Sequence, residues 1–171
     1  MSQRPAVSAG TDHAIRQFLG YEAMLLDEAR IAEWIALLDP AIVYEIPLRI
    51  AAQDRENELR RDAWRMRDTL PMLRKRLERL ATAENWAENP ASRTVRNVGS
   101  IFVEPTDEAD VYRTHSALTL FRQRATDRTF DWIAARRVDL IREAAGRCLL
   151  VRRTVILAET VLQLPSLSVF L

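Results

Sequence analysis

The chain has 171 residues, of which 48% are apolar, and this length and composition fit one globular domain with a sizeable core. Its 4 glycines and 7 prolines exclude a low-complexity or disordered protein. The 25 basic and 24 acidic residues nearly balance, for a net charge of +1, so charge alone predicts neither a nucleic-acid nor a membrane partner.

The single cysteine, Cys148, excludes an intramolecular disulfide and fits a reducing compartment. Residues 1–14 contain no apolar segment of the signal-peptide type, and no run approaches the roughly 18 apolar residues of a membrane-spanning helix. We therefore expect a soluble, cytoplasmic protein. Residues 1–14 are expected to form a disordered tail, and residues 15–171 a single domain.

The first 40 residues have helical periodicity. Thr11 or Asp12 can cap a helix, and a second short helix follows from Ile31. That second helix should end at Asp39, because proline at the next position disfavours helical backbone in the residue before it. The apolar positions of the first helix are Ile15, Phe18, Leu19, Leu25 and Leu26.

A first strand is predicted over residues 41–48, and a third helix begins at Asp68 with leucines at heptad-like spacing. Pro71 is tolerated in the first turn of this helix. Between these two elements, residues 49–67 are charged and irregular, and we expect a loop with some local structure.

The second half of the chain predicts a long antiparallel sheet, because runs of β-branched and aromatic residues alternate with turn sequences. Gly146 can adopt the positive φ that the last reversal needs. The runs cover residues 98–103, 110–124, 129–142 and 148–163. Helices followed by such a meander indicate an α+β fold, in which a strongly curved sheet wraps around its own helices as a cone. Both faces of the sheet carry apolar residues, so we expect helices on one face and neighbouring subunits on the other.

Several segments of the chain, taken together, resemble one known family. They are Phe18 to Glu28 (Phe-Leu-Gly-Tyr-Glu-Ala-Met-Leu-Leu-Asp-Glu), residues 33–38, 44–49 and 76–80, Trp86 to Thr94 (Trp-Ala-Glu-Asn-Pro-Ala-Ser-Arg-Thr), and residues 137–142 and 167–171. This ordered set resembles the β (small) subunit of aromatic-ring-hydroxylating dioxygenases and covers nearly the whole chain after residue 14.

The resemblance implies the cone-shaped α+β barrel of the NTF2-like, SnoaL-like type. It also implies a non-catalytic β subunit that assembles as a trimer with three α subunits in aromatic compound catabolism. In this family the α chain holds the Rieske [2Fe-2S] cluster and the mononuclear iron, so no cofactor is expected in this chain. Val95 and Arg96 stand where the family often has arginine and histidine, and Ala158 where it often has an acid; we expect these positions to face partners.

The number of residues that could bind iron agrees with the expectation that this chain holds no cofactor. A Rieske centre needs two thiolates and two imidazoles, and a facial iron triad needs two histidines and a carboxylate. The chain has one cysteine and only two histidines, His13 and His115. We expect no metal site within this chain, and Cys148 is expected to be a packed residue.

An alternative function is a stand-alone isomerase, dehydratase or cyclase that uses acid and base residues in the cone. The candidates for that chemistry are His115, Asp139, Tyr44 and Glu22. Each also has a structural interpretation: Asp139 can pair with Arg137 on the same strand face, and Tyr44 can be a core aromatic residue.

Assembly is expected to use sheet arginines and the apolar C-terminal residues. Unpaired charges on neighbouring strands would be costly, so carboxylates from this chain or another must lie near them. The interface candidates are Arg93, Arg136, Arg137, Arg152, Arg153, Phe170 and Leu171. An obligate trimer interface should bury roughly 2,000 Å² or more per pair of subunits.

Overall fold

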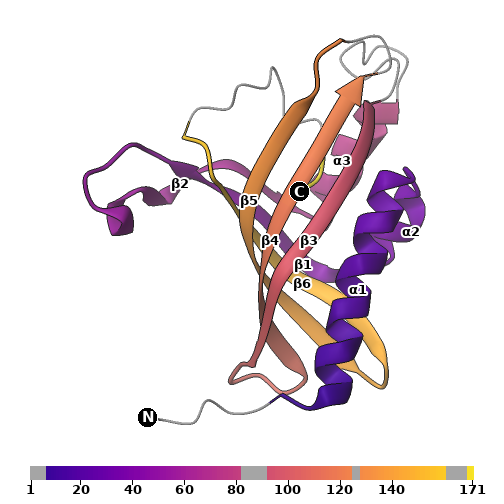
Figure 1. The fold of residues 1–171 in the computed structure, drawn as a ribbon. Helices are drawn as coiled ribbons and strands as arrows, with labels where there is room; N and C mark the ends of the chain where they lie inside the picture. Colours follow the sequence, from indigo (N-terminus) through magenta and orange to yellow (C-terminus); the bar gives the residue numbers. More distant parts are fainter. Residues whose placement is uncertain (1–6, 82–91, 125–127, 161–168) are drawn as a thin grey trace.

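The computed structural model describes residues 7–81, 92–124, 128–160 and 169–171. Two helices precede the first strand, a third helix follows the second strand, and four long strands complete the described chain (Figure 1). The elements are α1 (Ala9–Asp27), α2 (Ile31–Ile35), β1 (Leu38–Arg49), the 3₁₀ turn η1 (Arg55–Asn57), β2 (Leu59–Thr69), α3 (Leu70–Ala81), β3 (Ser92–Pro105), β4 (Val111–Arg124), β5 (Asp131–Ala144) and β6 (Arg147–Leu157).

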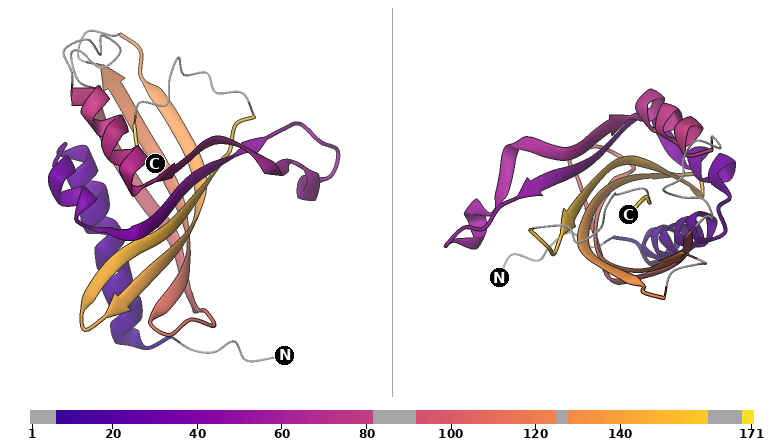
Figure 2. Two further views of the ribbon diagram at one scale, coloured as in Figure 1. Left: turned by 180° about the vertical axis from the view of Figure 1, so that it is seen from behind. Right: turned by 90° about the horizontal axis from the view of Figure 1, so that it is seen from above.

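The six strands form one sheet in the order β2-β1-β6-β5-β4-β3. Only β1 and β6 run parallel; the other neighbours are antiparallel. The sheet curls around α1 without closing, as the view from above shows (Figure 2). The predicted α+β cone is therefore confirmed.

Alternation along the strands separates an inner from an outer face of the cone. On β5, every second residue from Ile133 to Ile141 is buried, and the residues between them are more exposed. This inner face packs with apolar residues of α1 such as Ile15 and Leu19, both fully buried. The alternation of side chains along a strand thus directs every second residue of β5 into the cone, whereas in β6 the pattern shifts at the irregularity between Leu150 and Arg152.

The β5–β6 hairpin turns at Ala145 and Gly146, whose φ angles of 52° and 78° are both positive. Two central residues with positive φ define the turn type that matches the twist of a two-residue hairpin. The reversal predicted at Gly146 is confirmed.

The first helix begins earlier than predicted. Helix α1 starts at Ala9, inside the expected tail of residues 1–14. Ser8, which the sequence reasoning did not consider as a cap, accepts a hydrogen bond from the Thr11 amide at 3.0 Å. Thr11 and Asp12 therefore lie in the first turn, and the part of the predicted tail from residue 9 onward is helical.

The loop predicted over residues 49–67 is wrong for much of its length, because β2 occupies Leu59–Thr69. This strand lies at the edge of the sheet and pairs only with β1. Most of its charged side chains are exposed, so it lacks the apolar alternation of a half-buried strand, and backbone pairing with β1 holds it.

Other boundaries shift by a few residues. The helix α2 ends at Ile35 and β1 already begins at Leu38, before the proline. The strand predicted over 98–103 extends to Ser92–Pro105 because it pairs with β4 along almost its whole length. Most of the Trp86 to Thr94 segment and the end of the run predicted to residue 163 lie outside the described residues.

Candidate functional site

The inside of the cone contains a cluster of charges around Arg153 of β6, which is fully buried. Its guanidinium donates to Glu22 Oε1 and Oε2, both at 2.7 Å, and to Asp139 Oδ1 and Oδ2, both at 2.9 Å. The pairing register places Asp139 of β5 opposite Arg153, and α1 brings Glu22 from the other side. Two carboxylates thus each bind one guanidinium through two hydrogen bonds, which is a strong and geometrically specific arrangement.

Arg137 of β5 lies beside this pair and is also buried. Its Nε donates to Ser116 Oγ of β4 at 3.2 Å, and its Nη1 is 3.9 Å from Glu22 Oε2. Its Nη2 has no hydrogen-bond partner among the described residues. Two arginines and two carboxylates balance in charge, which is what makes their burial tolerable.

The electrostatics of the cluster shift the pKa values of Glu22 and Arg153 toward their charged forms and that of Arg137 away from its charged form. Burial would raise the pKa of Glu22, but Arg153 and Arg137 outweigh it and hold that pKa below its usual value. Burial opposes the charge of Arg153, yet Asp139 and Glu22 raise the pKa of that guanidinium. Burial lowers the pKa of Arg137, and the like charge of Arg153 adds to the effect. Glu22 is therefore a fixed anion near neutral pH and is not tuned to exchange a proton there.

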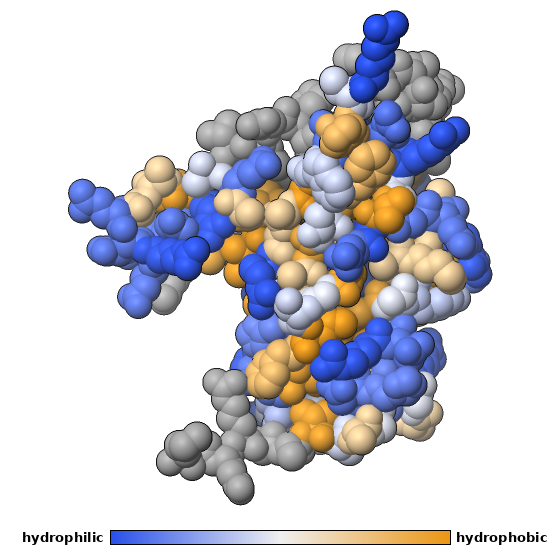
Figure 3. All heavy atoms as spheres, viewed as in Figure 1, coloured by the Kyte–Doolittle hydropathy of each residue, from blue (hydrophilic) through white to orange (hydrophobic). Residues whose placement is uncertain are grey.

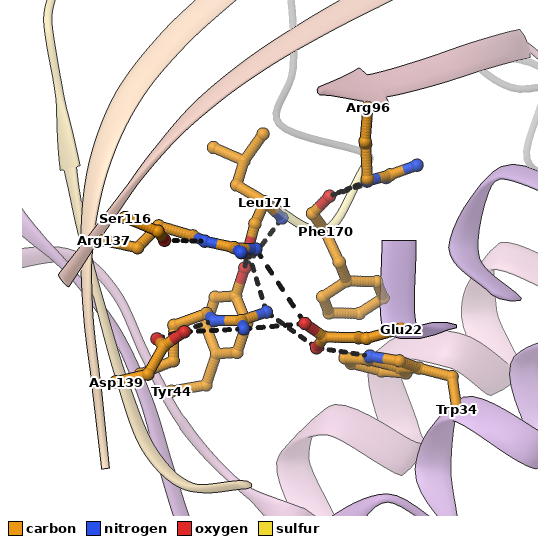
Figure 4. A network of polar contacts seen from close by, with 10 residues as sticks. Glu22, Trp34, Tyr44, Arg96, Ser116, Arg137, Asp139, Phe170 and Leu171 are labelled. Carbon is orange, nitrogen blue, oxygen red and sulfur yellow. Dashed lines mark hydrogen bonds and ion pairs between the residues drawn. The ribbon is translucent and has the colours of Figure 1, made fainter. Parts of the chain in front are cut away.

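Two residues at the end of the chain, Phe170 and Leu171, are buried inside the cone beside this cluster. The Tyr44 hydroxyl donates to the Leu171 carbonyl at 2.6 Å and accepts from the Leu171 amide at 2.7 Å. The ring of Phe170 packs on Trp34, with centroids 4.6 Å apart, and its carbonyl accepts from Arg96 Nη2 at 2.7 Å. Figure 4 shows how these residues surround the charged cluster.

Three of the four residues predicted for acid–base chemistry come together in this cluster: Glu22, Tyr44 and Asp139 (Figure 4). Asp139 is an ion-pair partner, as in its structural interpretation, although its main partner is Arg153 and not Arg137. Tyr44 is a fully buried core aromatic residue, and burial raises the pKa of its phenol, which stays protonated.

His115 does not join the cluster, which corrects the fourth prediction. Its neighbours Thr114 and Ser116 on β4 are fully buried and face the cone, so His115 points to the outer face. There its Nε2 lies 3.2 Å from Glu104 Oε1 of β3. The arrangement needed for a His and Asp acid–base pair is therefore not formed.

The interface candidates divide into two groups. Arg137, Arg153, Phe170 and Leu171 are buried within the chain, so their expected exposure to a partner is wrong. Arg93, Arg136 and Arg152 are exposed on the outer face and remain predicted contacts. Arg152 already pairs with Glu45 of β1 at 2.8 Å.

Arg96 also differs from its expected partner-facing role. It is largely buried, pairs with Asp27 of α1 and holds the Phe170 carbonyl. The sequence signal that was missed is the alternation of side chains along β3. Thr94 and Arg96 face α1, and Val95 between them points outward and is 62% exposed. Sequence alternation could have identified this face, but not its partner at the end of the chain.

No group of three or more His, Cys, Asp or Glu residues that could hold a metal ion occurs in residues 7–81, 92–124, 128–160 and 169–171. Cys148 is half-buried, and burial together with Glu143 raises the pKa of its thiol to about 11. This thiol stays protonated near neutral pH. In the same described part of the chain, no helix is both long and apolar enough to cross a membrane.

Comparison with known proteins gives a consistent result. A model of the family described as ring hydroxylating beta subunit matches residues 21–164. The chain is 39% identical to the beta subunit of an N,N-dimethyl phenylurea N-demethylase from Sphingobium sp. (strain YBL2), over 91% of this chain and 88% of the relative. It is 32% identical to the beta subunit of a benzene 1,2-dioxygenase from Pseudomonas putida, over 98% of this chain and 93% of the relative.

A solved structure has a chain with a closely similar fold. A chain in the structure of naphthalene 1,2-dioxygenase with indole bound in the active site superposes with a TM-score of 0.84 at 23% identity. The superposition covers 97% of this chain and 88% of the other.

Proposed function

The chain belongs to the family of ring-hydroxylating beta subunits, and we propose that it is the non-catalytic beta subunit of a multicomponent Rieske non-heme iron oxygenase in aromatic compound catabolism. The observation that carries the non-catalytic role is the placement of the end of the chain inside the cone. Phe170 and Leu171 occupy the cone where a stand-alone enzyme of this shape would bind its substrate.

The charges inside the cone support a structural role. Arg153 is satisfied by Glu22 and Asp139, so those carboxylates already have a buried counterion and are poorly placed to act on a substrate. Such a network fixes one arrangement of α1 against β5 and β6, because any other packing would leave a buried charge unpaired.

The partner of this chain is an alpha oxygenase subunit, as the family implies. We propose that the alpha chain carries both the Rieske cluster and the mononuclear iron, since those centres need several Cys and His ligands. Trimeric assembly of the beta subunits belongs to the same proposal. The names of the relatives, a phenylurea N-demethylase and a benzene dioxygenase, support a substrate with an aromatic ring.

The test is to purify the chain alone and together with a Rieske alpha chain encoded beside it. We expect the isolated chain to be free of iron and inactive, and the combined preparation to show the Rieske absorption spectrum and to hydroxylate an aromatic substrate. Bound iron or turnover in a preparation free of alpha chain would contradict the proposal. So would a failure of every co-expressed Rieske alpha chain to bind.

A further inference from the structure

The outer face of the sheet carries an aromatic patch that the interior does not explain. The pairing register aligns Val95 of β3, Phe121 of β4 and Trp132 of β5 in one row across three strands. Phe130 joins them, with its ring 5.4 Å from that of Phe121, centroid to centroid. Phe130 and Trp132 are 55% and 57% exposed. Figure 3 shows apolar side chains gathered on this face, where β3 begins and β4 ends. We call these four residues the aromatic patch.

The patch is continuous with a groove between α1 and β3. This groove has a volume of about 690 Å³, and Val95 belongs to both surfaces. Met24, Val98 and Ile101 add apolar side chains to its lining, and charged and polar side chains line the rest: Arg16, Asp27, Glu28, Arg96 and Asn97. The exposed apolar patch beside this mixed groove is typical of a protein-binding site.

Two arginines lie two residues from members of the aromatic patch: Arg93 on β3 and Arg128 before β5. Both are exposed, and neither forms an ion pair with another described residue. The surface that covers the patch should therefore offer apolar side chains together with carboxylates.

The chain itself carries a surface of that kind. An arm projects from the cone (Figures 1 and 2); it consists of the β1–β2 connection, residues 50–58, and the first half of β2 up to Trp64. Ile50 and Trp64 on it are 37% and 39% exposed. Near its tip, Asp54 and Glu56 flank Arg55, and the two carboxylates have no ion-pair partner in the described chain.

The base of the arm is fixed to the body. Arg49 donates to the Leu157 carbonyl at 2.6 Å, and Arg65 donates to the Thr160 carbonyl at 2.6 Å. Inside the arm, the Ile50 amide donates to the Glu58 carbonyl at 2.8 Å. The arm is thus held away from the cone as a hydrogen-bonded element, which lowers the entropic cost of docking it.

We propose that the arm of one copy docks on the aromatic patch of a second copy, with its carboxylates against Arg93 and Arg128. Arm and patch are different surfaces, so the contact is heterologous, and a threefold rotation between successive copies would close it into a ring. This inference rests on the proposed function, and it assigns the surfaces through which beta subunits join into the trimer.

The experiment compares the full chain with an arm variant (Ile50→Ser with Trp64→Ser) and a patch variant (Phe130→Ser with Trp132→Ser) by sedimentation velocity. We expect the unmodified chain to be a trimer and each variant to be a monomer with an unchanged circular dichroism spectrum. Met72→Ser is the control, since Met72 is equally apolar and 50% exposed but lies on α3. It should remain a trimer.

Mixing the two variants tests the pairing of arm with patch. The patch variant still has an arm and the arm variant still has a patch, so an equimolar mixture should form a one-to-one dimer and no trimer. A mixture that stays monomeric, or an arm variant that remains trimeric, overturns the inference. If the unmodified chain is monomeric and only the patch variant fails to bind the alpha chain, the alpha subunit covers the patch. That result also overturns the inference, but it leaves the proposed beta-subunit function intact.

Discussion

The buried guanidinium of Arg153 lies between two carboxylates, so its removal leaves Glu22 and Asp139 as like charges without their nearest counterion. We expect Arg153→Met to lower the free energy of unfolding by about 3–5 kcal/mol, because one partner of a buried ion network is removed. The neighbouring Arg152 is itself 45% exposed, and its buried partner Glu45 keeps Arg67 and Thr154 as further partners, so Arg152→Met should cost only about 1 kcal/mol. Urea denaturation of the two variants measures the difference, and equal costs would contradict the described interior.

The same cluster predicts a pH dependence of stability. The pKa of Glu22 is lower in the folded protein than its ordinary value of 4.5. Its ionisation therefore stabilises the fold at pH values above 4.5, and this contribution is lost as the pH falls through the lowered folded value. We expect Glu22→Gln to be less stable than the unmodified protein at neutral pH and to lose less stability on acidification below pH 4.5. Parallel acid-unfolding curves for the two proteins would show that Glu22 does not carry this dependence.

Sequence reasoning at the residue scale found three members of the cluster but misplaced others. Glu22, Tyr44 and Asp139 were identified by their chemistry. Arg137 and Arg153 were assigned to an interface because their charges need nearby carboxylates and burial that one chain was not expected to provide. Apolar residues two and four positions before Arg137 on the same strand, Ala135 and Ile133, already indicated the buried face.

At the scale of elements, the Phe170 and Leu171 segment is a packing element of the cone. Phe170 is buried against Trp34 and Tyr44. We expect Phe170→Ala to cost about 3–5 kcal/mol, the usual range for a truncated core aromatic residue. Met72→Ala, at a position on α3 that is 50% exposed, is the control and should change the free energy of unfolding by about 0.5 kcal/mol or less. Thermal or urea unfolding distinguishes the two, and a Phe170→Ala protein as stable as the control would show that the segment is not part of the core.

The elements that the sequence predicted well are those whose partners lie nearby along the chain. The strands β4 and β5 pair with sequence neighbours through short turns, and their predicted bounds differ from the observed ones by only a few residues. In contrast, β2 was missed because its stability depends on pairing with β1 at the sheet edge, which leaves no local apolar pattern. The parallel pairing of β1 with β6 joins residues about one hundred positions apart, such as Tyr44 and Arg153, and local periodicity contains no information about it.

At the scale of the whole molecule, the described chain packs its own end inside the cone and leaves apolar side chains exposed on the outer face. The interior is built from residues of helices, five strands and the end of the chain, and Arg96 links that end to α1 through Asp27. An assay of the assembled oxygenase can therefore measure two quantities separately, the amount of folded beta subunit and the activity of each alpha subunit. A change inside the cone should alter how much beta subunit is available, whereas catalysis per alpha subunit should be unaffected.

Tyr44→Phe provides the sharpest test of that separation. It removes the one hydroxyl that both donates to and accepts from Leu171 but keeps the ring packed against Phe170. We expect a stability loss of about 1–2 kcal/mol and an activity per bound iron that changes by less than about twofold in the assembled oxygenase. Loss of a general acid or base would instead lower activity by about 100-fold or more. The control is Tyr112→Phe on β4, which removes a tyrosine hydroxyl from a half-buried position elsewhere in the sheet. A large loss of activity per iron in Tyr44→Phe alone would mean that the cone takes part in the chemistry, and the non-catalytic role proposed for this chain would be wrong.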